Sequence, residues 1–184
     1  MNSISSFIER KLKLKVNKAK SAVDRPWKRK FLGFTFGMEK EKPQIRTATQ
    51  SLQRVKAKIK AKTSRRRSPP MEIRIRELNQ YLMGWCGYYA LAETKSVFQE
   101  LDAWTRRRLR MCKWKQWNLP RTKTRELISL GIPKHKAYEW GNSRKKYWRI
   151  ALSPVLSRAL GNQYWATNGL QSLTDRYKLL RNMT

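Results

Sequence analysis

The sequence is poor in acidic residues, cysteine and histidine, and each shortage excludes a class of chemistry. Only 12 Asp and Glu stand against 43 Lys and Arg, with two cysteines and one histidine, His135. Two separated cysteines cannot build a structural zinc site, and one histidine leaves no His-based triad and no two-histidine metal site. The sequence contains no GxxxxGK[ST] loop, which argues against ATP use.

Carboxylates for metal-dependent phosphoryl chemistry are also scarce. The only aspartates are Asp24, Asp102 and Asp175. None is paired with another in the close arrangement that often holds two magnesium ions. We therefore predict no catalytic residues, no metal site and no cofactor in this chain.

Long apolar runs are missing as well. No segment approaches the roughly 20 apolar residues that a membrane-spanning helix needs, and residues 1–10 lack the apolar stretch of a signal peptide. Cys86 and Cys112 form no CxxC pair, which is consistent with a reducing compartment and with small core residues. We predict a cytoplasmic protein without a membrane partner.

The sequence is rich in positive charge and in aromatic side chains. The formal net charge is +31 over 184 residues, and Lys and Arg run from Arg10 to Arg181, so the charge is not a basic tail. Such a chain repels itself until a polyanion neutralises it, and each phosphate contact releases a counterion. The hydrophobic share of 40%, with eight Trp, is too large for a disordered chain. These features predict a folded nucleic-acid-binding protein.

The first 49 residues are typical of a small β-containing module. We expect a short helix at 2–10, a strand with a lysine face at 11–17, and further strands at 31–38 and 44–49. Gly33 and Gly37 share one face of the strand at 31–38, where another segment could approach the backbone closely. These elements are too short to close a core alone.

Apolar stripes at helical spacing then predict a mainly helical remainder, so the fold class is α+β, mainly α. A basic helix from about residue 50 ends at the SRRRSPP linker, and longer helices are expected at 71–91 and 95–117. Gly84 and Gly87 suggest a packing partner against the helix at 71–91. Shorter helices are expected at 122–130, 134–141, 146–151, 154–160 and 172–181, with Ser153 as an N-cap before Pro154.

The helix at 95–117 has one apolar and one basic face at 100° per residue. Arg108 is the exception, because it falls in the apolar arc, where its stem could snorkel. Trp114 and Trp117 fall among the arginines, and two interpretations are open: they stack on bases, or they bury against the next segment. For the arginines we predict an exposed, phosphate-binding face.

We predict nucleic-acid contacts in three places: the segment 50–70, the basic face of 95–117, and the cluster at 134–149. The predicted contact residues are Arg54, Lys56, Lys58, Lys62, Arg65, Arg66, Arg67, Arg106, Arg107, Arg110, Lys113, Trp114, Trp117, Lys134, His135, Lys136, Arg144, Lys145 and Lys146.

Several runs resemble group II intron-encoded reverse transcriptases. LKVNKAKSAVDRPWKRKFLGFTF (14–36) is similar to the end of their palm, and LNQYLMGWCGYY (78–89) with LDAWTRRRLRMCKWKQW (101–117) resembles the maturase-specific domain X, the polymerase thumb. GLQSLTDRYKLLR (169–181) resembles the DNA-binding region of the endonuclease-less bacterial class. The resemblance implies a palm end at 1–49, a three-helix thumb at 50–118 and a helical DNA- or RNA-binding region at 119–184.

The sequence also departs from that family. The fingers and most of the palm are missing, including the YADD-type motif, so the magnesium ions of the family would bind outside this chain. A truncated reading frame, a decayed intron copy and one half of a split protein each explain this departure.

Three functions follow as expectations. The first is a maturase-type fragment that binds group II intron RNA, together with a DNA target or an RNA–DNA duplex. The second is a thumb subunit that completes a separately encoded palm and fingers fragment, restoring an RNA-directed DNA polymerase. The third is an unrelated basic RNA-binding protein.

Overall fold

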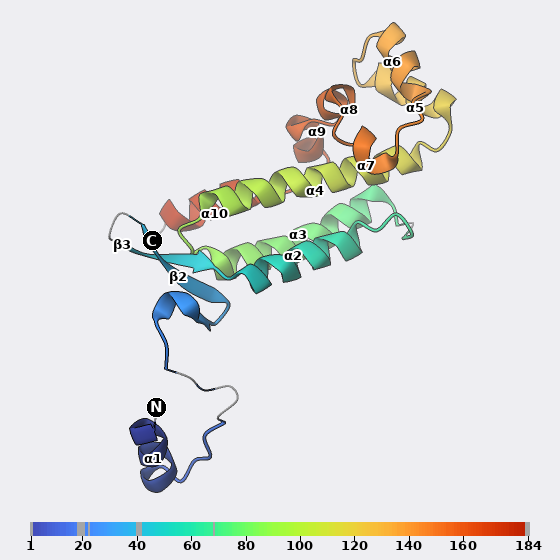
Figure 1. Ribbon diagram of the computed structural model, residues 1–184. Coiled ribbons are helices and arrows are strands. Elements are labelled where there is room, and N and C mark those ends of the chain that lie inside the picture. The colour runs from blue at the N-terminus through green and yellow to red at the C-terminus, as the bar shows by residue number, and fades with distance from the viewer. Residues whose placement is uncertain (1, 18–20, 22, 40–41, 68, 183–184) are drawn as a thin grey trace.

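The computed structural model describes residues 2–17, 21, 23–39, 42–67 and 69–182 (Figure 1). Within them the chain is mainly helical with one small antiparallel sheet, which confirms the α+β, mainly α class. The elements in order are α1 (Asn2–Lys11), η1 (Pro26–Lys28), β1 (Lys30–Phe31), β2 (Phe34–Glu39), β3 (Lys42–Thr47), α2 (Thr49–Lys62), α3 (Met71–Tyr89), α4 (Lys95–Gln116), α5 (Pro120–Ser129), α6 (Lys134–Gly141), α7 (Tyr147–Ile150), α8 (Pro154–Ala159), α9 (Asn162–Thr167) and α10 (Leu173–Asn182).

The N-terminal segment is partly as predicted. Helix α1 forms, but the expected strand at 11–17 is wrong: Lys11 ends α1 and the described residues after it are irregular. Leu12 and Leu14 are 54% and 60% exposed. An alternating pattern needs a neighbouring strand and a buried face, and the three-stranded sheet of the described residues pairs only β1, β2 and β3.

The predicted strand at 31–38 is interrupted by a turn. Leu32 (φ 50°) and Gly33 (φ 83°) separate β1 from β2, and β2 pairs with β3 from Phe34 opposite Thr47 to Glu39 opposite Lys42. A Cβ at Gly33 would lie 2.4 Å from the Tyr89 hydroxyl oxygen, so the predicted close approach to this glycine is confirmed. The returning strand ends at Thr47 rather than residue 49, because Thr49 already begins α2.

Aromatic side chains attach the sheet to the end of α3. The Phe34 ring lies 5.6 Å from the Tyr88 ring and 5.1 Å from the Tyr89 ring. The Tyr88 hydroxyl donates to the Leu32 carbonyl oxygen at 2.8 Å, and the Glu93 amide donates to the Ile45 carbonyl oxygen at 2.8 Å. These contacts hold the sheet against the end of α3 and the residues that follow it.

Helices α2, α3 and α4 form the central bundle, and α10 packs on α3 and α4 (Figure 1). The predicted stripes point inward, with Val55, Ile59 and Leu78 completely buried. Gly84 and Gly87, in contrast, have no atom within 4 Å of an added Cβ, so the packing partner expected there is wrong. Both glycines lie on the exposed side of α3.

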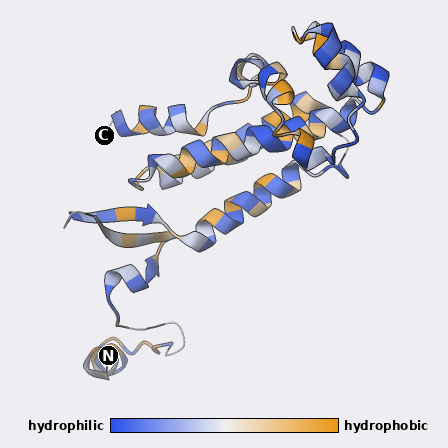
Figure 2. Cartoon of the chain, turned by 45° about the horizontal axis from the view of Figure 1, so that its top comes forward, coloured by the Kyte–Doolittle hydropathy of each residue, from blue (hydrophilic) through white to orange (hydrophobic). Residues whose placement is uncertain are grey.

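One hydrophobic cluster extends from α2 to the C-terminal helices. It includes Val55, Trp117, Leu127 and Tyr177, and the Tyr177 ring stacks on Phe98 with centroids 4.4 Å apart. The domain boundary predicted at 118 thus does not separate two cores, and it stays a prediction in functional terms. Figure 2 shows hydrophobic residues alternating with hydrophilic ones along these helices.

The C-terminal helices match the predicted short pieces with one addition. Ser153 caps α8 as predicted, because its hydroxyl accepts from the Leu156 amide at 3.3 Å. Helix α9, NQYWAT, was not expected. Its six residues are too few for an amphipathic period, and Trp165, 1% exposed, packs into the shared core.

The two cysteines are free and buried, as predicted for core residues. Burial raises the pKa of Cys86 to about 11, and it also raises the pKa of Cys112.

Both thiols are expected to react with a disulfide reagent at pH 8 only as fast as the protein opens, and at the rate of a free thiol in denaturant. Because the unfolded thiol ionises first, Cys86 should also lower stability as pH rises from 9 to 11. Fast labelling of the native protein would contradict this packing.

Candidate nucleic-acid interface

Helix α2 presents exposed basic side chains on both flanks of its buried stripe. Val55 and Ile59 occupy its inner face, so the residues between them point outward. The exposed basic residues are Arg54, Lys56, Lys58 and Lys60. Lys62 differs, because it is half-buried and its ammonium nitrogen lies 3.7 Å from a Glu77 carboxylate oxygen. Arg54 lies four residues before Lys58, and Lys56 lies four residues before Lys60. Like charges at this spacing destabilise a free helix and favour an anionic partner.

The basic loop after α2 is held in place by a buried arginine. Arg74 of α3 is 2% exposed. Its Nη1 donates to the carbonyl oxygens of Lys62 (2.6 Å) and Ser64 (3.3 Å), and Nη2 donates to that of Arg67 at 3.1 Å. Arg74 therefore closes the C-terminal end of α2, where a cation is favourable, and fixes the backbone that carries Arg65 and Arg66.

Sequence reasoning missed Arg74, although a signal existed. It lies four residues before Leu78, in the apolar stripe of the helix, where a charged residue must find partners or escape to solvent.

Changing Arg74 to Lys is expected to lower the free energy of unfolding by about 2 kcal/mol, because one ammonium cannot span three carbonyl groups. RNA affinity should fall with it, since the loop loses its anchor. Urea denaturation measures the first effect and filter binding the second. Arg76→Lys, at an exposed position on the same helix, is the matched control and should change neither.

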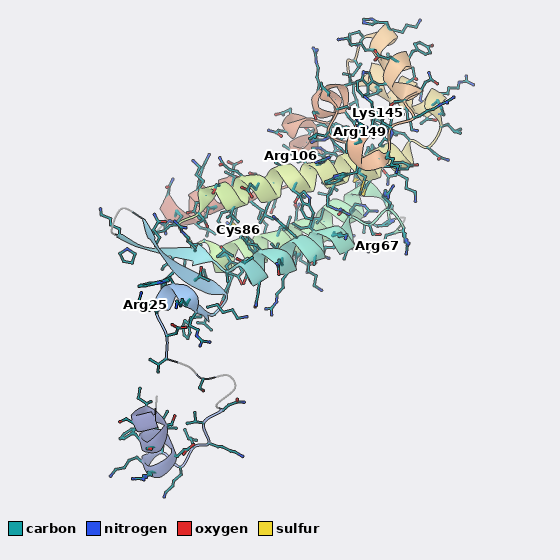
Figure 3. The ribbon with its side chains drawn as sticks, in the orientation of Figure 1. Arg25, Arg67, Cys86, Arg106, Lys145 and Arg149 are labelled. Atoms are coloured by element: carbon teal, nitrogen blue, oxygen red, sulfur yellow. The ribbon has the colours of Figure 1, made fainter. Side chains whose placement is uncertain are left out.

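The three loop arginines are not equivalent. Arg67 forms a two-point ion pair with Glu77, at 3.0 Å and 3.1 Å, and this hydrogen bonding lowers the pKa of Glu77. Figure 3 shows Arg67 near the end of the α2–α3 pair. The Arg65 guanidinium lies over the Tyr147 ring, 4.9 Å from its centroid, and Arg66 is exposed. Arg65 and Arg66 are thus better placed for phosphate than Arg67.

The basic face of α4 is not the exposed surface that we predicted. Arg110 is 9% exposed, and its Nε and Nη1 donate to the carbonyl oxygens of Ala151 (2.8 Å) and Leu160 (3.5 Å). These residues end α7 and α8, so the cation satisfies the carbonyl ends of two helices. Burial, with Arg106 and Arg107 nearby, lowers the pKa of Arg110 to about 10. The predicted phosphate contact by Arg110 is therefore wrong.

Trp114 and Trp117 are also buried, at 2% and 5% exposure, with their rings 5.8 Å apart. Their predicted base stacking is wrong, and the alternative of burial against the next segment is confirmed. Lys123 of α5 lies over the Trp114 ring, 5.0 Å from its centroid, and α7 packs on α4 nearby (Figure 1). Such a cover depends on distant segments, which the helical period of 95–117 cannot reveal.

Four further cations of α4, Arg106, Arg107, Arg108 and Lys113, are half-buried. Arg107 donates to the Trp148 carbonyl oxygen at 3.1 Å and lies over its ring, 3.9 Å from the centroid. Arg108 donates to the Thr63 hydroxyl at 2.5 Å, which joins α4 to the end of α2, and burial lowers its pKa. Arg106 and Lys113 are half-buried beside them, and their roles stay predictions.

The predicted cluster at 134–149 divides into two parts. Lys134, His135 and Lys136 are exposed on α6, which lies beyond the end of the bundle (Figure 1). Arg144, Lys145 and Lys146 are exposed just before α7, which packs on α4. Figure 3 shows Lys145 and Arg149 close to each other near α7. The structure therefore joins the second part, but not the first, to the basic loop after α2.

A pocket of about 470 Å³ lies where these segments meet. It is lined by Lys60, Ser64, Arg65, Arg66, Arg108, Met111, Lys115, Tyr147 and Trp148. Lys115 donates to the Arg65 carbonyl oxygen at 2.6 Å, so α4 also supports the loop. Cations with neighbouring aromatic rings are the combination that binds phosphates and bases of single strands.

Nothing in the described residues fits the magnesium ions of the resembling polymerases. Within that part of the chain, no group of three or more His, Cys, Asp or Glu could hold a metal ion. A separate search of the same residues finds no helix with the length and apolar character needed to cross a membrane.

Comparison with known proteins agrees with the bundle. Residues 52–131 match the family model described as group II intron, maturase-specific domain. This segment contains nearly all of α2, the whole of α3 and α4, and α5. The search of curated proteins found no match. The family match supports a maturase role in group II intron splicing and an association with group II intron RNA.

Proposed function

We propose that the protein binds group II intron RNA through one continuous basic surface and thereby assists splicing. The surface consists of the outer side of α2, the loop at 64–67 and the residues before α7. The observation that supports this proposal most is one of position. The exposed cations of α2 and of the loop after it lie inside the segment that matches the maturase-specific domain.

The assistance is electrostatic. Packing intron helices together brings phosphates close, and a fixed array of cations lowers their repulsion. Buried Arg74 and the contact of Lys115 with the loop hold the array in a defined shape, so the surface selects RNA whose phosphates match it.

The finer parts of the proposal concern the rest of the chain. Residues 119–184 would contact a DNA target or RNA–DNA duplex through Lys134, His135 and Lys136, which face solvent on α6. The chain as a whole would be the C-terminal part of an endonuclease-less intron-encoded reverse transcriptase, working in the cytoplasm.

The test is the splicing rate of a group II intron RNA. Adding the protein at low magnesium is expected to raise the splicing rate, and raising magnesium should reduce the benefit, because both supply counter-charge. No acceleration at any magnesium concentration would contradict the proposal.

A second candidate is favoured by the N-terminal sheet. Trp27, Phe31 and Leu32 are 51%, 66% and 67% exposed, so apolar side chains near the sheet lack cover within the described chain. We propose as the alternative that a separately encoded palm and fingers fragment covers them and forms an RNA-directed DNA polymerase. Primer extension by the mixed fragments, absent from either alone, would support it, and failure of the mixture would exclude it.

A further inference from the structure

The pocket beside α7 is lined by the most exposed tryptophan of helices α2 to α10. Trp114 and Trp165 are 2% and 1% exposed, whereas Trp148 is 37% exposed and lines the pocket. Trp85, Trp104 and Trp140 lie between these extremes, half-buried against the same core. Trp148 instead presents part of an indole to a cavity rimmed by cations.

The position of Trp148 is fixed from several sides. Arg107 donates to its carbonyl oxygen at 3.1 Å and lies over its ring at 3.9 Å, and the neighbouring Arg108 lies 5.9 Å from the same ring. Ile150 and Ala151, which follow it, are completely buried, and Arg110 binds the Ala151 carbonyl oxygen. The ring is therefore preorganised, which lowers the entropic cost of stacking a ligand on it.

The rim of the pocket carries cations from segments other than α7. Lys60 comes from α2, Arg65 and Arg66 from the loop, and Lys115 from α4. These side chains converge from three segments that are joined by hydrogen bonds of Arg74, Arg108 and Lys115. A flat aromatic ring next to several cations is chemically complementary to a nucleotide, because the base can stack on the ring while the anionic phosphate pairs with a cation.

We propose that this pocket holds one unpaired nucleotide of the bound RNA, with its base against Trp148 and a flanking phosphate at Lys60 and Arg66. The proposal rests on the RNA-binding function proposed above. The volume of about 470 Å³ lies within the roughly 300–1,000 Å³ usual for small-ligand sites. The nucleotide must be unpaired, because in a duplex both faces of each base are covered by its neighbours.

The test compares two RNA hairpins that differ only by a single bulged adenosine. Trp148→Leu is expected to bind the bulged hairpin about ten-fold more weakly than the unchanged protein, which is the scale of one lost base stack. Its affinity for the fully paired hairpin should stay the same. Trp148→Phe keeps a ring and should retain most of the difference. Trp27→Leu, an exposed tryptophan on η1, is the matched control and should bind both hairpins normally.

A second measurement needs no variant. A 4-thiouridine placed at the bulge of the RNA should crosslink, in the unchanged protein, to the peptide that contains Tyr147 and Trp148. A crosslink elsewhere would overturn the inference, as would equal losses on both hairpins or no loss on either. If the unchanged protein binds both hairpins tightly but equally, the pocket proposal fails and RNA binding stands. If it binds neither, both proposals fail.

Discussion

Replacing Lys56, Lys58, Lys60 and Arg66 by Gln is expected to weaken binding to group II intron RNA by at least about a hundred-fold near 0.15 M salt. Each lost phosphate contact removes about one released counterion, which corresponds to roughly five-fold in affinity at that salt. The slope of log affinity against log salt should become less steep by about three to four. Filter binding over a series of salt concentrations measures both quantities.

The matched control changes the same number of cations elsewhere. Arg10, Lys11, Lys13 and Lys15 are exposed around the end of α1, away from the bundle. Their replacement by Gln lowers the net charge equally, so a general attraction of a basic chain for RNA would be reduced equally. Similar losses for the two variants would show that net charge, and not the α2 surface, determines the affinity.

Replacing Asp102 by Ala is expected to lower the free energy of unfolding by about 3 kcal/mol. The Asp102 side chain of α4 is buried, and its carboxylate caps the start of α10. It accepts from the amides of Leu173 and Thr174, both at 2.9 Å, and from the Thr174 hydroxyl at 2.7 Å. The variant would leave these donors without their partner and remove a negative charge from a helix N-terminus.

Urea denaturation followed by circular dichroism measures this effect. Asp175→Ala is the control, because that carboxylate lies on the same helix with a side-chain exposure of 75% and an ion pair to Lys178 at 3.7 Å. Its loss should be within a few tenths of a kcal/mol. Equal destabilisation by the two substitutions would mean that Asp102 does not hold α10 against the bundle.

Asp102 also illustrates what sequence alone could not provide. In the sequence, Asp102 is one of three widely separated aspartates, and nothing in the order of residues shows that positions 102 and 173 meet. The same holds for Arg110, whose partners Ala151 and Leu160 lie far along the chain. A helical wheel places such residues on a face, but it cannot say whether another helix covers that face.

The long helices were predictable because their cause is local. The stripes that contain Val55, Leu78 and Leu101 repeat at helical spacing, and each is buried in the structure. The strand at 11–17 failed for the opposite reason, because a strand depends on a neighbour that the pattern does not specify. The prediction that Ser153 caps a helix is confirmed, because an N-cap depends only on residues within one helical turn.

The arginines consequently fall into two groups that composition cannot separate. Arg74 and Arg110 bind backbone carbonyl groups inside the fold, and they shape the loop after α2 and the cover of α4. Arg54 and Arg66 face solvent and remain available for phosphate. Part of the positive charge therefore stabilises the fold that supports the interface, and the remainder is exposed on the interface itself.

The most direct test of the central claim compares two RNAs of equal length at equal salt. The unchanged protein is titrated with a group II intron RNA and with an unrelated structured transcript. A shaped basic surface predicts tighter binding to the intron RNA. Replacing Lys56, Lys58, Lys60 and Arg66 by Gln should abolish this difference. Equal affinity for the two RNAs, with the same salt dependence, would contradict it.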